Sequence, residues 1–204
     1  MQTLLNQGLT ALSLPSDADK EAKLLAFIEL ICKWNKAYNL TAVRDKEAMV
    51  SLHLLDSLAI LPYLHGQRFV DIGTGAGLPG IPLAIYQPEK EFVLIDSNAK
   101  KTRFVQQVIL ELGLKNVTVL HSRVEAYQSA VLFDTVLCRA FATMNEIIKL
   151  TQHLLCADGL LLAMKGQVPE AELAQLAQHY QVISLTVPSI AAQRCLIYVK
   201  KQPT

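Results

Sequence analysis

The chain has 204 residues, of which 51% are hydrophobic and 18% charged, and its formal net charge at pH 7 is +1. This length is typical of one domain with a single buried core. We expect a soluble, cytoplasmic protein, because no apolar stretch reaches the roughly 18 to 20 uncharged residues of a membrane span and the first residues do not resemble a secretory signal. The near-neutral charge gives no support for a nucleic-acid partner, since only a strongly basic domain would point to one.

The cysteines exclude two kinds of site. They are widely scattered and form no C-x-x-C pair; they are Cys32, Cys138, Cys156 and Cys195. This spacing argues against a zinc site and against a disulfide framework in a chain of this size. We therefore expect buried thiols and no metal site.

The first 65 residues are predicted to form a helical cap. Residues 19–38 repeat apolar side chains with a helical period, and Asp17 stands just before them. Residues 45–64 repeat the same pattern. We expect residues 1–65 to pack as part of one compact unit with the remaining domain, residues 66–204.

From residue 67 onward, short apolar runs alternate with longer helical stretches, a pattern typical of parallel strands joined by crossover helices. The predicted strands are 68–72, 92–96, 117–120, 134–138 and 159–164. The predicted helices are 79–86, 98–112, 143–156 and 169–179. Two further strands, 182–187 and 195–200, are expected to form an antiparallel hairpin. The pattern predicts a doubly wound α/β fold with a mostly parallel, seven-stranded sheet.

The sharpest motif is a glycine-rich turn after the first predicted strand. The turn contains Gly73, Gly75 and Gly77. Glycines at alternate positions allow the backbone to approach a ligand where any Cβ would collide. Residues 75–80 also satisfy G-x-G-x-x-G, and Asp96 stands 21 residues after Gly75, where a dinucleotide-binding protein carries its ribose-binding acid. The glycines alone therefore leave the type of cofactor open.

Asp71 helps to discriminate between the cofactors. At the carboxyl end of the first strand its carboxylate would repel the pyrophosphate of a nicotinamide dinucleotide, but it would attract the sulfonium and amino cations of S-adenosylmethionine. Asp96 ends the second strand, where it can accept hydrogen bonds from ribose hydroxyls, and Ser97 either contacts the cofactor or caps the next helix. The segment 122–125 would face the adenine. S-adenosylmethionine is favoured, with an NAD(P)-dependent oxidoreductase or a non-catalytic nucleotide-binding module as alternatives.

The ordered set of motifs resembles one family, the bacterial small-subunit rRNA guanine-N7 methyltransferases called RsmG, formerly GidB. The motifs are Trp34-Asn-Lys-Ala-Tyr-Asn39-Leu-Thr41, His53-Leu-Leu-Asp56-Ser57, the turn from Asp71 to Pro82, Asp96-Ser97 with Lys100-Lys101, Ser122-Arg123-Val124-Glu125, Arg139-Ala140 and Lys165-Gly166. The resemblance spans nearly the whole chain, and its one departure at a motif position is Val124, where the family often has Ala. It implies a Rossmann-like class I S-adenosylmethionine-dependent methyltransferase that modifies N7 of guanine 527 in 16S rRNA of the small ribosomal subunit. We expect a monomer.

The resemblance also implies which residues surround the cofactor. They are Gly73, Leu78, Val124, Glu125 and Arg139. Guanine N7 already carries an in-plane lone pair, so methyl transfer to it needs alignment but no general base or covalent nucleophile. A methyltransferase that acts on a small molecule remains an alternative.

The end of the fourth predicted strand suggests how the acceptor is held. It lacks the Asp/Asn-Pro-Pro-aromatic motif of amino-nitrogen methyltransferases, and Cys138 is expected in the core. Arg139 can hydrogen-bond guanine O6, a phosphate or the cofactor carboxylate. Lys165 and Arg123, at the same sheet edge, are expected to engage RNA phosphate, and Phe141 is a candidate to stack on an extruded base. The catalytic candidates are therefore Arg139, Lys165 and Arg123.

Residues of the cap are harder to interpret. Trp34 is expected to anchor the core, and Asn39 to end its helix in a left-handed turn. His53 and Asp56 lie one helical turn apart and can hydrogen-bond each other, for a structural or a catalytic purpose. The roles of Asn39, His53 and Asp56 stay open.

Overall fold

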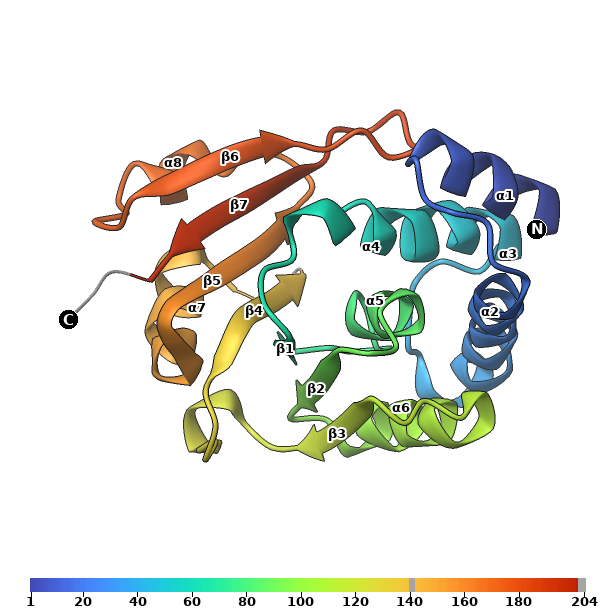
Figure 1. The fold of residues 1–204 in the computed structure, drawn as a ribbon, viewed down its shortest axis with the longest axis horizontal. Coiled ribbons are helices and arrows are strands. Elements are labelled where there is room, and N and C mark those ends of the chain that lie inside the picture. The colour runs from blue at the N-terminus through green and yellow to red at the C-terminus, as the bar shows by residue number, and fades with distance from the viewer. Residues whose placement is uncertain (140–141, 202–204) are drawn as a thin grey trace.

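The computed structural model describes residues 1–139 and 142–201. Its centre is a seven-stranded sheet in the order β3-β2-β1-β4-β5-β7-β6 (Figure 1). The strands are β1 (Arg68–Ile72), β2 (Glu91–Asp96), β3 (Val117–His121), β4 (Phe133–Arg139), β5 (Leu155–Lys165), β6 (Tyr180–Ser184) and β7 (Cys195–Lys200). The first five are parallel, and β7 runs antiparallel to both β5 and β6. The predicted α/β class and the antiparallel pairing of the last two strands are confirmed.

The sheet is covered on both faces. Neighbouring strand residues alternate between the faces, so that Phe69 belongs to the larger apolar cluster and Val70 to the smaller one. The larger cluster includes residues of α5 (Gly80–Tyr86) and α6 (Ala99–Leu112), and the smaller includes residues of α7 (Met144–Thr151). Burial on both faces is the physical reason for the near-continuous apolar runs of the strands.

The amino-terminal helices join the larger cluster. They are α1 (Gln2–Ala11), α2 (Ala18–Tyr38), α3 (Lys46–Met49), the π-helical segment η1 (Val50–Leu55), α4 (Asp56–Leu58) and the 3-10 turn η2 (Leu61–Tyr63). The Asp17 carboxylate caps α2 by accepting hydrogen bonds from the backbone N–H groups of Asp19 and Lys20. Asn39 ends α2 at φ 49°, the left-handed turn expected for it. Trp34 packs against Phe104 in this cluster, also as expected.

Several elements differ from the prediction. The helix expected over 45–64 is broken by the π-helical segment, and α1 was not predicted. The helix expected over 143–156 ends at Thr151, because residues from Leu155 already pair with β4, so that β5 begins before the predicted 159. The helix expected over 169–179 is only α8 (Glu170–Leu173), in which Leu173 is the one buried side chain.

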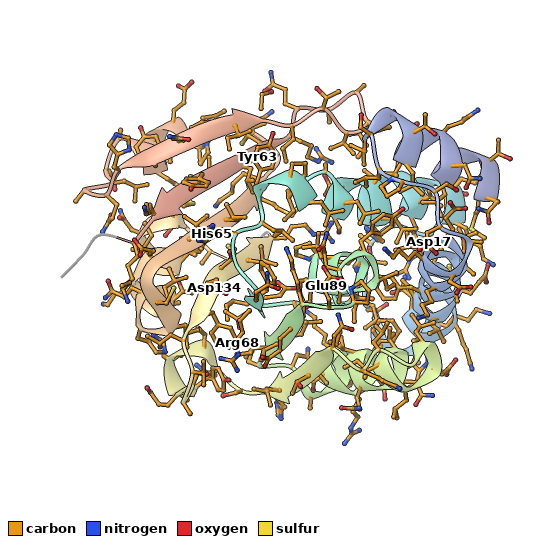
Figure 2. All side chains as sticks on the ribbon, in the orientation of Figure 1. Asp17, Tyr63, His65, Arg68, Glu89 and Asp134 are labelled. Atoms are coloured by element: carbon orange, nitrogen blue, oxygen red, sulfur yellow. The ribbon has the colours of Figure 1, made fainter. Side chains whose placement is uncertain are left out.

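The last but one of the predicted strands also shifts. β6 spans Tyr180–Ser184 rather than 182–187, because Leu185 and Val187 leave the sheet and are buried in the larger apolar cluster. At the amino ends of the central strands, Asp134 accepts hydrogen bonds from the backbone N–H groups of Gln67 and Arg68 at 2.7 and 2.9 Å, which ties the start of β1 to β4 (Figure 2). Among the described residues, no helix has the length and hydropathy to cross a membrane.

Candidate active site

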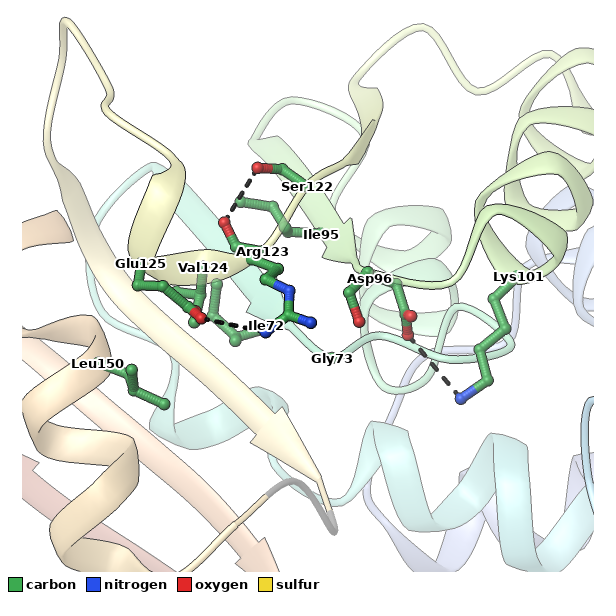
Figure 3. A pocket seen from close by; sticks show the side chains of 11 residues that line it. Ile72, Gly73, Ile95, Asp96, Lys101, Ser122, Arg123, Val124, Glu125 and Leu150 are labelled. Carbon is green, nitrogen blue, oxygen red and sulfur yellow. Dashed lines mark hydrogen bonds and ion pairs between the residues drawn. The ribbon is translucent and has the colours of Figure 1, made fainter.

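A cavity of about 470 Å³ opens at the carboxyl ends of β1, β2 and β3. Three neighbouring parallel strands end here, which is the usual place for a ligand in an open α/β sheet. The cavity is lined by Ile72, Gly73, Ile95, Asp96, Ser97, Lys101, Ser122, Arg123, Val124, Glu125 and Leu150. Figure 3 shows Asp96 and Lys101 on one side of it and the 123–125 segment on the other. We call this space the first cavity.

Asp96 connects the glycine-rich turn to the end of β2. Its carboxylate is buried and accepts hydrogen bonds from the backbone N–H groups of Gly75 at 2.9 Å and Asn98 at 2.8 Å, while Lys101 Nζ lies 4.0 Å away. Asn98, not Ser97, caps α6, since its side chain accepts from the N–H of Lys100. These hydrogen bonds therefore hold the glycine-rich turn against Asp96, which itself lines the first cavity.

Asp71 supports the glycine-rich turn through its buried carboxylate. Its Oδ2 accepts hydrogen bonds from Thr74 Oγ1 at 2.6 Å and from the Gly80 N–H at 3.0 Å, while Oδ1 is buried with no partner among the described residues. Burial raises the pKa of this carboxyl to about 6, and the hydrogen bonds from Thr74 and Gly80 work in the opposite direction. Asp71 does not line the first cavity.

The turn depends on glycine at a defined position. Gly77 has φ +85°, and a Cβ built there would lie 2.6 Å from Ile81 Cγ1. Both the left-handed conformation and this contact exclude a side chain. The turn can therefore follow the end of β1 only with glycine at this position.

The far wall of the first cavity follows β3. Ser122 leads into the short 3-10 segment η3 (Val124–Ala126), whose Val124 is buried. Arg123 is 77% exposed and forms an ion pair of 3.9 Å with Glu125. Two acidic and two basic side chains line this cavity, so its charges balance.

A second cavity, of about 520 Å³, opens at the carboxyl ends of β4 and β5. It is lined by Val43, Leu52, His53, Asp56, Arg139, Met164, Lys165, Gly166, Leu185, Arg194 and Cys195. The two cavities adjoin, because Ile72 pairs with Cys138 and the next residues, Gly73 and Arg139, line one cavity each. The strand order thus places two separate cavities side by side.

Arg139 and Lys165 are both held by backbone and carboxylate oxygens. Arg139 Nη1 donates to Leu52 O at 3.1 Å and to Asp56 Oδ2 at 3.3 Å. Lys165 Nζ donates to Ala142 O at 2.9 Å and lies 3.4 Å from Glu172 Oε2. Arg139 is therefore connected to the cap rather than to the first cavity.

Near Arg139, the imidazole of His53 is a poor proton acceptor and the thiol of Cys138 is a poor nucleophile. Burial, and secondly the charge of Arg139, lower the pKa of His53 to about 4. His53 Nε2 lies 3.0 Å from Thr41 Oγ1, and its Nδ1 is buried without a partner among the described residues. Burial raises the pKa of the Cys138 thiol to about 12, which fits its predicted place in the core.

A family model described as GidB, rRNA small subunit methyltransferase G, matches residues 20–197. The chain belongs to this family. It is 50% identical over 199 residues to the ribosomal RNA small subunit methyltransferase G of Legionella pneumophila (strain Lens), covering 98% of this chain and 94% of the relative. It is 48% identical over 205 residues to the protein of the same name from Alteromonas mediterranea, covering 99% and 97%. The predicted family and enzyme class are confirmed, and an oxidoreductase is not favoured.

Several solved structures share this fold. TYW2 of M. jannaschii, solved in complex with AdoMet, has a TM-score of 0.57 at 16% identity and covers 76% of this chain and 78% of that chain. NodS, an N-methyltransferase from Bradyrhizobium japonicum solved with S-adenosyl-l-homocysteine, has a TM-score of 0.58 at 14% identity, with coverage of 83% and 98%. At these identities the likeness concerns the fold, and it confirms the predicted class I architecture.

The predicted site residues are divided by the structure. The first cavity brings together Gly73, Asp96, Ser97, Arg123, Val124 and Glu125. The second contains Arg139 and Lys165. Neither cavity is lined by Asp71, Gly75, Gly77 or Leu78, of which the first three shape the turn through the contacts above and Leu78 is buried. Phe141 lies outside the described residues. All of these ligand roles stay predictions.

Sequence reasoning missed Arg194 and offered only His53 as a partner of Asp56. Arg194 precedes β7 in a connection without any motif, so no local signal marks it. Asp56 and His53 are not hydrogen-bonded to each other in the described structure, contrary to one possibility; Asp56 instead pairs with Arg139 and Arg194. Lys101 belongs to the recognised Lys100-Lys101 motif, and only the fold shows that it lines the first cavity.

Proposed function

We propose that this protein transfers the methyl group of S-adenosylmethionine to N7 of a single guanine, position 527, in 16S rRNA of the small ribosomal subunit. The observation that carries the proposal is the pair of adjoining cavities at one sheet edge, in a chain that belongs to an rRNA small subunit methyltransferase family. One cavity is charge-balanced and the other is basic. Their chemistry matches a cofactor without phosphate beside an anionic acceptor.

The first cavity fits S-adenosylmethionine, the cofactor of this enzyme. A dinucleotide would bring two phosphate charges, and the cavity has no excess positive charge to receive them. Asp96 would hold the ribose hydroxyls, the 122–125 segment would surround the adenine, and Gly73 would leave room for the chain that carries the sulfonium. Asp71 Oδ1, which is buried and has no partner in the part of the chain that the structure describes, adds negative potential beside the turn. When bound, the cofactor supplies an electrophilic methyl group.

The acceptor chemistry fits the groups that the second cavity offers. An amino-nitrogen or carbon acceptor needs a proton acceptor or a nucleophile, whereas guanine N7 attacks directly with its lone pair. His53, with a pKa near 4, and Cys138, with a pKa near 12, are unsuited to these roles near neutral pH. Arg139 lies beside Gly73 at the strand ends and is placed to orient a purine through its oxygen acceptors. Alignment by hydrogen bonds is the catalysis we propose here.

We further infer that the protein acts as a monomer in the cytoplasm. The proposed cofactor and acceptor sites adjoin within one chain, so the proposed reaction needs no residue from a second copy. A ribosomal RNA acceptor supports the proposed cytoplasmic location. Light scattering after size-exclusion chromatography tests the first point: a mass near 22.5 kDa supports it, and twice that mass contradicts it.

The decisive experiment uses labelled S-adenosylmethionine with small ribosomal subunits, and with deproteinised rRNA, from cells that lack this gene. Borohydride and aniline treatment then cleaves RNA at 7-methylguanine. Scission at guanine 527 supports the full proposal, and label without scission contradicts the N7 assignment. No label in either substrate would favour a small-molecule acceptor and contradict the rRNA assignment. Asp96→Ala serves as the inactive control, since it removes a carboxylate that lines the first cavity.

A further inference from the structure

The charge of the second cavity is its most informative property. Its lining contains one acidic side chain, Asp56, and three basic ones, Arg139, Lys165 and Arg194. His53 is neutral there because its pKa is lowered to about 4. Glu172, outside the lining, pairs with Lys165 at 3.4 Å, so the excess of positive charge comes from the two arginines against the single Asp56. This excess contrasts with the balanced first cavity and favours a ligand that carries a phosphate.

A single carboxylate organises two of these cations. Asp56 Oδ2 lies 3.3 Å from Arg139 Nη1, and its Oδ1 accepts a hydrogen bond from Arg194 Nε at 3.1 Å. The side chain of Asp56 is 6% exposed, whereas those of Arg139 and Arg194 are 24% and 21% exposed. The three residues come from α4, from the end of β4 and from the connection before β7. Without this carboxylate, two guanidinium groups of like charge would repel each other at the same place.

Both arginines keep unused donors. In the described structure Arg139 donates only through Nη1, and Arg194 donates through Nε to Asp56 and through Nη1 to Gln193 O. A guanidinium carries five N–H donors in a fixed plane, so Nη2 of each group, and Nε of Arg139, remain able to bind a ligand. Fixing one edge of the guanidinium determines where the remaining donors point.

The positions of Arg139 and Arg194 in the fold suggest that the two guanidinium groups bind different parts of the ligand. Arg139 ends β4 beside Gly73, which is the side from which the methyl group arrives. Arg194 lies on the outer connection between β6 and β7, farther along the strand order. In the proposed reaction the base would react where the two cavities meet, and its phosphate would lie away from that point. Arg139 is thus suited to the oxygen edge of the base and Arg194 to the phosphate.

We propose that the second cavity receives the acceptor guanosine nucleotide and that Asp56 is a positioning residue, which holds Arg139 toward the base and Arg194 toward the phosphate. This inference rests on the proposed function, because it takes an RNA guanine as the acceptor. Asp56 itself does not touch the reacting atoms. His53 lines the same cavity, and its buried Nδ1 has no partner within residues 1–139 and 142–201.

A purely structural role for Asp56 is the competing explanation, since the same ion pairs fasten the cap to the sheet. Glu21 provides a matched control: it is also a buried carboxylate of the cap, but its partners are Gln2, Ser16 and the Asp17 N–H, with no cation among them. Glu21→Gln and Asp56→Asn both remove a buried charge from the cap. Only Asp56→Asn disturbs the arginines.

The test compares wild type, Asp56→Asn, Asp56→Glu, Arg194→Ala and the Asp56→Asn/Arg194→Ala double variant with Glu21→Gln. The cofactor Kd is measured by calorimetry, and kcat and KM with small ribosomal subunits lacking the modification. We expect Asp56→Asn to lower kcat/KM for RNA by at least about 30-fold, while its cofactor Kd stays within about twofold of wild type. Asp56→Glu should recover part of the loss, and Glu21→Gln should leave both constants near wild type.

Two further readouts separate positioning from folding. If Asp56 acts through Arg194, the double variant loses less than the product of the two single losses. Arg194→Ala should mainly raise KM for RNA and reduce the slope of log KM against log salt by about 0.7 to 0.9, the value for one phosphate contact. Strictly multiplicative losses, or a cofactor Kd that weakens in parallel with turnover, would overturn the inference. If wild type itself does not label RNA, the proposed function fails; if wild type is active and Asp56→Asn is unaffected, only this inference fails.

Discussion

Replacing Asp71 by asparagine should change how the stability of the protein depends on pH. Burial raises the pKa of Asp71 from 3.8 to about 6. Because the folded state binds this proton more tightly than the unfolded state, the protonated carboxyl contributes stability below pH 3.8, and that contribution is lost as the pH rises through 6. Each pKa unit corresponds to about 1.4 kcal/mol, so the complete loss is about 3 kcal/mol. The asparagine side chain would stay neutral throughout and keep an oxygen acceptor for Thr74 and Gly80.

The assay is urea unfolding followed by circular dichroism between pH 4 and 8, without cofactor. The free energy of unfolding of Asp71→Asn minus that of wild type should increase with pH by about 2 to 3 kcal/mol over this interval. If the new amide changes the free energy of unfolding by the same amount at every pH, the increase of the difference with pH is unaffected. Glu146→Gln is a control: hydrogen bonds from Thr143 lower the pKa of Glu146 from 4.5, so its contribution is lost only on acidification below that value and its difference from wild type should stay nearly flat from pH 5 to 8. A difference for Asp71→Asn that is flat from pH 4 to 8 would refute the reasoning.

Three other substitutions test the site. Asp96→Ala leaves the N–H of Gly75 without its charged acceptor and removes the proposed ribose ligand, so calorimetry should show cofactor affinity at least about tenfold weaker; an unchanged Kd would contradict the assignment. Gly77→Ala forces a Cβ against Ile81 at φ +85° and should lower the free energy of unfolding by about 1 to 3 kcal/mol in urea titrations, a loss that a surface alanine control should not show. Cys138→Ala should keep methyl transfer within a few-fold of wild type, whereas abolished activity with intact folding would mean that the thiol takes part.

The proposed boundary between cap and domain at residue 65 is also open to experiment. The larger apolar cluster contains side chains from both sides of it, such as Leu54 and Phe69. We therefore expect both parts to unfold in one transition, followed by the fluorescence of Trp34 and by circular dichroism together. Two separated transitions would show that the cap is an independent unit.

Local pattern was sufficient for the sheet and for the turn. Strands buried on both faces read as apolar runs, and the crossover helices between them repeat with a helical period, so the order of elements from β1 to α6 follows from the sequence. The glycines of the turn are visible because the chain must adopt positive φ there, as at Gly77. The predicted boundaries were wrong where tertiary pairing overrode local propensity. For example, Leu155 pairs with β4 as the first residue of β5, and α7 is shorter than predicted.

The sequence by itself determined the fold class, the cofactor motif and the family resemblance, because each of these is recorded in residues close together in the chain or in a fixed order along it. Only the tertiary structure decided which charged groups work together. Arg139 and Arg194 stand 83 and 138 positions after Asp56, and the three residues meet only because α4, the end of β4 and the connection before β7 converge at one edge of the sheet. An ion pair formed across such separations leaves no periodic signal, since the electrostatic attraction depends on distance in space and not on distance along the chain.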